Sequence, residues 1–298
     1  MRKNKIILDT DPGIDDAIAI IVLLSECSER VDLILSSYGN ISVEYTTQNA
    51  LMMLSLLKSD IPVVKGTHMP NNKNYTDASH IHGVDGLGGL NVDVSTRKAI
   101  EGDYLQITYD RIIKAGMVDY ITLGPLTNLA LLIKRFPDVV SHIEKVVSMG
   151  GGMDRGNVTK FAEFNIYCDA ESASYVFSSI KEIVLVPLNI TSTVAFNLEQ
   201  IEAIGRFKTP IAKAMEQILT ENYHCCSRYG NHGSTMHDAT AVLYYLYPEL
   251  FTVRKCGIEV DCSERYGQTR LYDNQNNVTL ALETNPELLL VKITDCIK

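Results

Sequence analysis

Short apolar runs alternate with longer segments of helical periodicity through the first two thirds of the chain. Such alternation is typical of βαβ units, in which successive strands run parallel and helices cover the sheet. We therefore predict an α/β fold with an open, mostly parallel, Rossmann-like sheet flanked by helices. The strands are expected at 6–8, 31–37, 62–65, 120–123, 143–149 and 183–187. Helices are expected at 15–28, at 43–58, near 103–116 and at 169–179. A further helix is expected after the strand 120–123, with Pro125 in its first turn.

The rest of the chain has a different pattern. Residues 66–92 are polar and rich in glycine, and we expect a long loop there on the binding face. Beyond residue 195 the pattern becomes mainly helical, and antiparallel strands such as 278–282 are expected near the end. There is no internal repeat, low-complexity tract or clear linker. We therefore expect residues 1–298 to form a single domain, with the C-terminal third packed on the same sheet.

Composition excludes several classes of protein. The chain has 298 residues and a formal charge of −9, without a block of Lys and Arg, which argues against binding of nucleic acid or of a membrane surface. No window approaches the roughly 18 apolar residues of a membrane span, and the start MRKNKIILDTD does not read as a secretory signal. The seven cysteines are odd in number and lack CxxC spacing, so we expect reduced thiols in a cytoplasmic protein.

Four aspartates lie where the first strand gives way to the first helix: Asp9, Asp11, Asp15 and Asp16. Ligands of open parallel sheets bind at this edge. Two carboxylates about 4 Å apart repel by roughly 4 kcal/mol at an effective dielectric constant near 20, whereas a helix dipole returns only about 0.3–1 kcal/mol per group. The cluster therefore requires raised pKa values or a bound cation. Because His and Cys are absent nearby, Ca²⁺ or Mg²⁺ is favoured over zinc or copper.

Two other interpretations of the acidic turn compete with a metal site. The aspartates could cap the helix at the surface, or they could be the DxD of a phosphohydrolase of the haloacid dehalogenase type, with Asp9 as the nucleophile. In that second scheme Thr or Val usually follows two residues after the DxD, where this chain has Gly13. The Asp15–Asp16 pair also has no part in that scheme, so the fit is poor.

The whole string DTDPGIDDA resembles the signature of the inosine-uridine preferring nucleoside hydrolases. Six further blocks look like those of that family and follow in its order. They are SYGN at 37–40, HGVDGLGG at 82–89, LGPLTNLA at 123–130, MGGG at 149–152, AEFNIYCDAESA at 162–173 and MHDATAV at 236–242. The resemblance implies an enzyme that hydrolyses the N-ribosidic bond of ribonucleosides to ribose and free base, in nucleoside salvage.

The resemblance also implies the roles of individual residues. One Ca²⁺ would be held by Asp11, Asp16, the carbonyl of Leu123 and Asp238, although Asp238 could instead cap a helix. Asp11 would also act as the general base, and His237 would protonate the leaving base, although a lone His is often structural. Ribose would be bound by Asp15, Asn40, Asn157, Glu163 and Asn165, of which Asn157 could instead be a plain turn residue.

The base side of the site is less constrained. His82 is expected to close over the site or to cap its loop, and Tyr229 to assist protonation or stack on the base. The chain has no Trp, so a tryptophan stack is excluded. Tyr229 and His237 together look like those of pyrimidine-preferring or broad-specificity members. Asn189 stands where the family usually has Asp.

Three further expectations complete this interpretation. Asp9 is expected to support the turn or to contact bound water. A homo-oligomer, either a dimer or a tetramer, is expected because it is common among relatives. A nucleoside-binding protein that has lost catalysis is the alternative from another class, and the intact set of polar residues argues against it.

Overall fold

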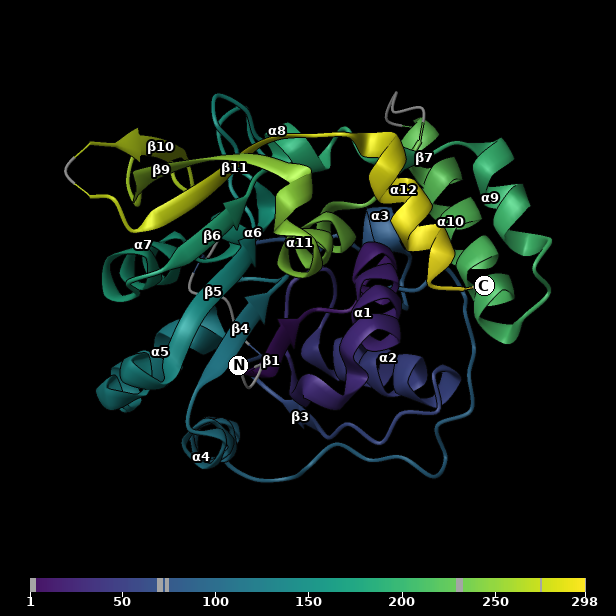
Figure 1. Cartoon of the computed structure of the whole chain (residues 1–298), viewed down its shortest axis with the longest axis horizontal. Coiled ribbons are helices and arrows are strands. Elements are labelled where there is room, and N and C mark those ends of the chain that lie inside the picture. The colour runs from purple at the N-terminus through teal and green to yellow at the C-terminus, as the bar shows by residue number, and fades with distance from the viewer. Residues whose placement is uncertain (1–3, 69–71, 73–74, 229–232, 274, 298) are drawn as a thin grey trace.

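A nine-stranded sheet forms the centre of the molecule (Figure 1). The computed structural model describes residues 4–68, 72, 75–228, 233–273 and 275–297. The strands are β1 (Lys5–Thr10), β2 (Val31–Ser36), β3 (Val63–Lys65), β4 (Val118–Thr122), β5 (Ile143–Met149), β6 (Ile183–Val186), β9 (Phe251–Val260), β10 (Thr269–Tyr272) and β11 (Val278–Thr284). A separate two-stranded sheet pairs β7 (Ala195–Phe196) with β8 (Ser234–Thr235).

The strand order explains where a ligand can bind. The sheet runs β10-β9-β11-β6-β5-β4-β1-β2-β3, and every pair from β3 to β11 is parallel, whereas β9 and β10 are antiparallel additions. The chain therefore winds outward from β1 to β3 and then returns to place β4 on the other side of β1. This reversal leaves a crevice at the carboxyl ends of β1 and β4, which is the usual binding position in doubly wound folds.

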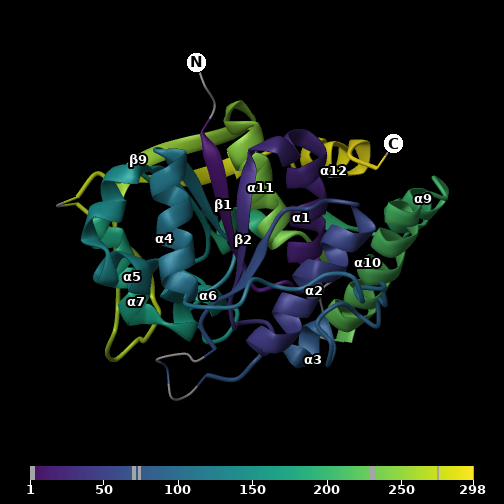
Figure 2. The same cartoon turned by 90° about the horizontal axis from the view of Figure 1, so that it is seen from below.

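Helices cover both faces of the sheet, as Figure 2 shows. One face carries α1 (Ile14–Cys27), α2 (Val43–Leu56), α10 (Pro210–Arg228) and α11 (His237–Leu246), and the other carries α4 (Tyr104–Ala115), α5 (Thr127–Arg135) and α7 (Ala170–Ser179). In β1, Ile6 and Leu8 belong to the first of these cores and Ile7 to the second. Burial on both faces is why the strands appear as continuous apolar runs.

The remaining elements are short or peripheral. They are α3 (Ser79–His82), α6 (Phe164–Cys168), α8 (Leu188–Thr191), α9 (Leu198–Gly205), α12 (Pro286–Asp295) and the 3₁₀ turns Ser28–Arg30, Pro137–His142 and Pro248–Leu250. The parallel sheet and the packing of the C-terminal third on it are confirmed, since β11 pairs with β6. The position of Pro125 was wrong: α5 begins at Thr127 with Leu126 as its N-cap, so Pro125 precedes the helix.

Helix α11 is held by contacts near both of its ends. Its N-terminus lies beside α1, and near its C-terminus the hydroxyl of Tyr245 donates a hydrogen bond to Asp119 Oδ2 at 2.7 Å. Arg30 forms an ion pair with the same carboxylate at 3.3 Å. Asp119 and Tyr245 are both buried. Contacts with α1 and with β4 therefore hold the helix that begins with His237 and Asp238.

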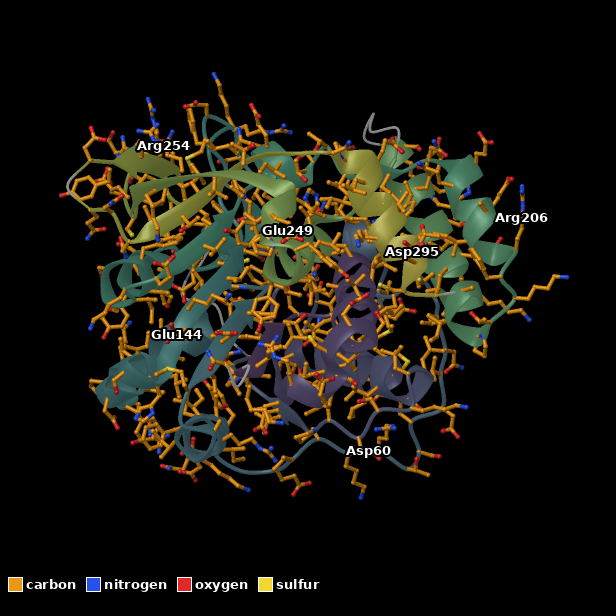
Figure 3. The ribbon with its side chains drawn as sticks, in the orientation of Figure 1. Asp60, Glu144, Arg206, Glu249, Arg254 and Asp295 are labelled. Atoms are coloured by element: carbon orange, nitrogen blue, oxygen red, sulfur yellow. The ribbon has the colours of Figure 1, made fainter. Side chains whose placement is uncertain are left out.

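Charged side chains of both signs are spread over the surface, and Figure 3 labels six of the exposed ones, among them Asp60 and Arg206. Of the helices in the described ranges, none combines the length and hydropathy that crossing a bilayer requires. All seven cysteines are free thiols, as the scattered spacing predicted.

Candidate active site

A cavity of about 440 Å³ opens at the carboxyl ends of the parallel strands. Eight of the residues that sequence analysis placed in the site line it: Asp15, Asn40, Leu123, Asn157, Glu163, Asn165, His237 and Asp238. They come from α1, α6, the loops after β2, β4 and β5, and the start of α11. Segments more than 200 residues apart along the chain therefore meet at one point.

Asp16 fixes the turn between β1 and α1. Its Oδ2 accepts hydrogen bonds from the backbone N–H of Gly13 at 3.0 Å and from the side-chain amide of Asn40 at 3.0 Å. Its Oδ1 accepts from the hydroxyl of Thr10 at 2.5 Å. The bond from Gly13 satisfies a backbone donor at the helix start, which explains why α1 begins here. Asp16 is therefore both a helix cap and a buried carboxylate beside the cavity.

Asp11 is held tightly against two glycine backbones. Its Oδ2 accepts from the backbone N–H of Asn40 at 2.7 Å, whereas its buried Oδ1 has no hydrogen-bond partner among the described residues. A Cβ on Gly39 would lie 2.0 Å from Oδ2, and one on Gly124 would lie 2.4 Å from Oδ1. Only glycine permits this close approach, which accounts for the glycines of SYGN and LGPL.

The carboxylates of Asp15, Asp16 and Asp238 form the group best arranged for a cation. Each offers an oxygen within 4.8 Å of the other two, and all three are buried. Asp11 lies outside that group, but its charge still contributes to raising the pKa of Asp238, after burial and the charges of Asp15 and Asp16. Burial, followed by the charge of Asp16, likewise raises the pKa of Asp11.

These carboxylates fit a hard divalent cation. Buried like charges are stable together only when protonated or neutralised, and the unpartnered Oδ1 of Asp11 provides a further oxygen. The Leu123 carbonyl also faces the cavity and accepts from Asn165 Nδ2 at 2.6 Å, which occupies one of its two lone pairs. The described residues thus offer the oxygen-rich donor set that Ca²⁺ and Mg²⁺ take.

Glu163 and Asn165 form the wall of the cavity opposite the acidic turn. The carboxylate of Glu163 accepts three backbone N–H bonds, from Asn165 at 2.9 Å, Gly151 at 2.8 Å and Ile166 at 3.1 Å. Burial nevertheless raises its pKa to about 7. Asn157 lines the cavity and also accepts from Phe164 N–H at 2.9 Å, so it has both the turn role and the pocket position.

His237 is oriented by a residue that sequence analysis missed. Its Nδ1 lies 2.7 Å from the buried hydroxyl of Thr191 at the end of α8, which leaves Nε2 for a ligand. Burial lowers the pKa of His237, an effect that Asp15 opposes and Arg155 reinforces. Thr191 belongs to the block NITST, in which only Asn189 was singled out from the sequence. Asn189 instead exchanges two hydrogen bonds of 2.8 Å with the backbone of Met153.

Asp9 faces away from the cavity. Its carboxylate accepts from Tyr120 at 2.7 Å and from the side-chain amide of Asn128 at 2.9 Å, and burial raises its pKa to about 7. Its side chain therefore joins β1 to β4 and α5, and the expected support of the turn itself stays a prediction. The phosphohydrolase alternative is wrong, because that scheme needs Asp9 as an accessible nucleophile and the residue is fully buried.

Two predicted site residues are not placed by the structure, and several lining residues were not predicted. Tyr229 lies outside the described residues, and only the backbone of His82, at the end of α3, is described. The unpredicted lining residues include His80, Ile81, Met149, Asn222, Cys226 and Thr235. Asn222 had a detectable signal, since it extends the buried stripe of Met215, Ile218 and Leu219 along α10.

Comparison with known proteins agrees with this geometry. Residues 6–290 match the family model of the inosine-uridine preferring nucleoside hydrolases. The chain belongs to this family. Its members are glycosidase-type hydrolases.

Individual relatives of this nucleoside hydrolase cover nearly all of it. A non-specific ribonucleoside hydrolase of Klebsiella pneumoniae is 36% identical over 257 residues, covering 86% of this chain and 83% of its own length. Among solved structures, a purine-preferring ribonucleoside hydrolase from Gardnerella vaginalis has a TM-score of 0.91 at 27% identity and 98% coverage of both chains. A plant nucleoside hydrolase has a TM-score of 0.88 at 28% identity and 99% coverage of both.

Proposed function

We propose that this chain is a Ca²⁺-dependent ribonucleoside hydrolase that releases ribose and a free base in nucleoside salvage. The observation that carries the proposal is the buried group Asp15, Asp16 and Asp238 beside the unpartnered Oδ1 of Asp11. Asp11, Asp16, Asp238 and the Leu123 carbonyl would hold the cation. When bound, a divalent cation makes water a stronger nucleophile and balances the carboxylate charge.

The residues of the chain have separate tasks in this proposal. Oδ1 of Asp11 accepts the proton of the attacking water. The oxygens of Asp15, Asn40, Asn157, Glu163 and Asn165 bind the ribose hydroxyls and favour the positive charge that develops on the sugar. In this proposal the hydroxyl of Thr191, which lies 2.7 Å from Nδ1 of His237, is the donor of that hydrogen bond, so that the ring proton resides on Nε2 and can pass to the departing base.

The activity is tested with inosine and uridine in phosphate-free buffer, with release of free base followed by chromatography. EDTA should abolish release, and Ca²⁺ should restore it more fully than Mg²⁺. The Asp11→Ala variant should lose at least about three orders of magnitude in kcat, because a base and a ligand are removed together. Asp60→Asn, which changes an exposed carboxylate labelled in Figure 3, should match the unaltered enzyme. Formation of ribose 1-phosphate only when phosphate is supplied would contradict hydrolysis.

Selectivity for ribonucleosides is also part of the proposal. A wall of buried polar groups rejects a substrate that lacks a hydroxyl, because its donors and acceptors are left without partners. We expect uridine to be hydrolysed far faster than 2′-deoxyuridine, and similar rates would contradict this. For the base, we propose broad or pyrimidine-preferring specificity, which a panel of uridine, cytidine, inosine and adenosine measures.

Three properties of the whole protein complete the proposal. Residues 1–298 would form one domain, which is supported by β1 and β11 lying in the same sheet. A cytoplasmic location is supported by the seven free thiols. A homodimer or homotetramer stays a prediction, and light scattering of the purified protein measures it.

A further inference from the structure

The cavity has a second end that the proposed roles leave unassigned. The side chains that would bind a cation and ribose come from α1, α6, the start of α11 and the loops after β1, β2 and β5, whereas other lining residues come from α3, α10 and β8. Ile81 and Cys226 give this end an apolar surface, and Asn222 is a polar group within it. His80 and Thr235 are further polar residues of these elements that line the cavity. An apolar surface with a few oriented polar groups suits a planar heterocycle.

Asn222 is buried, with 4% of its surface exposed, and its side-chain orientation is fixed by two donors. The hydroxyl of Ser234 donates to Asn222 Oδ1 at 2.8 Å, and the thiol of Cys226, one helical turn later, donates to the same oxygen at 3.5 Å. Burial raises the pKa of Cys226 to about 11, so the thiol keeps the proton that it donates. Because the oxygen is occupied twice, the amide group cannot rotate by half a turn without losing both bonds.

The fixed oxygen determines what Asn222 presents to the cavity. Within the described ranges of the chain, no group accepts a hydrogen bond from its Nδ2, although this residue lines the cavity. Nδ2 can therefore donate to an acceptor on a ligand in the cavity, and a hydrogen bond of this kind contributes about 0.5–1.5 kcal/mol. The site therefore has an oriented donor on the side of the cavity that α10 forms.

We propose that Asn222 determines base specificity by donating its Nδ2–H to a ring carbonyl oxygen of the nucleobase. When the ribose–nitrogen bond breaks, the electron pair stays on the base and spreads onto such a carbonyl, so the same donor also stabilises the leaving group. A base with an exocyclic amino group at that position would present a second donor to Nδ2. This inference rests on the proposed nucleoside hydrolase function and assigns it a residue.

The test compares matched pairs of substrates, inosine with adenosine and uridine with cytidine. Asn222→Asp turns the group that faces the base from a donor into an acceptor. The ratio of kcat/KM for oxo to amino substrates should fall by at least about tenfold in that variant, as expected for one inverted hydrogen bond. Asn222→Leu, with similar volume and no donor, tests the same ratio should the aspartate variant not fold.

Two more variants separate specificity from stability. Ser234→Ala releases one of the two bonds that orient the amide and should lower the ratio by about threefold. Ser227→Ala, whose hydroxyl is bonded to the Tyr223 carbonyl on the same helix, should leave the ratio unchanged. Hydrolysis of p-nitrophenyl riboside, which has no ring carbonyl, should fall less in Asn222→Asp than hydrolysis of inosine does.

The outcomes distinguish this inference from the proposed function. Absence of base release from every nucleoside by the unaltered enzyme would refute the function itself. An active enzyme whose ratio stays within about twofold in both Asn222 variants would refute the role of Asn222 alone, because an oriented donor in contact with the base must affect discrimination.

Discussion

The buried carboxyl group of Glu163 should make the stability of the protein depend on pH in a defined window. Its pKa is about 7 in the folded protein, against 4.5 for the ordinary side chain. The folded state therefore holds more protons than the unfolded state between these values. The contribution of Glu163 to the free energy of unfolding is fully present below about pH 4.5 and is lost as the pH rises through about 7.

The magnitude follows from the shift. One pKa unit corresponds to about 1.4 kcal/mol. The shift from 4.5 to about 7 therefore lowers the free energy of unfolding by about 3 kcal/mol between the low-pH and the high-pH end of the window. Between pH 5 and pH 8 the free energy of unfolding should fall by about 2.5 kcal/mol on account of Glu163. Glu163→Gln cannot ionise and removes this slope. It should also be less stable at low pH, because its amide group cannot accept from all three backbone donors.

The measurement is urea unfolding of both proteins at several pH values between 5 and 8, with EDTA present to exclude cation binding. The slope attributed to Glu163 is the difference between the two proteins, since the other buried acids are common to both. Glu202→Gln, an exposed position on α9, is the control and should behave as the unaltered chain. A difference that stays constant across the pH range would refute the reasoning.

Three further changes have defined outcomes. Asp238→Asn should raise the melting temperature of the metal-free protein at neutral pH, because it relieves repulsion among the buried carboxylates. It should also abolish stabilisation by added Ca²⁺. A melting temperature that still rises with Ca²⁺ in this variant would contradict the ligand role of Asp238. Thr191→Val removes the group that orients His237 and should lower kcat on inosine about tenfold, with a smaller loss on p-nitrophenyl riboside, as steady-state kinetics would measure. Tyr245→Phe removes a donor from buried Asp119 and should cost about 1–3 kcal/mol in urea unfolding.

Much of the fold could be predicted because its strands are buried on both faces. Continuous apolar runs such as β1 and β5 mark the sheet, and the intervening segments mark its helices. Helix ends were less predictable. Pro125 suits a first helical turn by its fixed backbone angle, but α5 begins two residues later, after a turn that places Gly124 against Asp11. The requirement of the site for that close contact outweighed the local preference.

The candidate site was predictable where its residues are adjacent in sequence. The four aspartates of the acidic turn lie in one short motif, and His237 and Asp238 lie in another. Residues that act through distant partners were not found. Thr191 reaches His237 across 46 residues, and Ser234 reaches Asn222 from a different element. Nothing in the local sequence distinguishes these hydroxyls from ordinary buried threonine and serine, because their function depends on tertiary packing.

The contact between Asp238 and Asp15, 223 residues apart, also bears on synthesis of the protein. While the chain emerges from the ribosome, α1, which contains Asp15 and Asp16, and the strands β1 and β2 on either side of it are made long before the third carboxylate exists. The repulsion within the group is thus postponed until α11 docks, when most of the sheet is already in place. A nascent chain that stops before residue 238 would have two of the three carboxylates and would not retain the ion. Cation binding is therefore a property of the nearly finished polypeptide, and it marks the end of folding rather than its beginning.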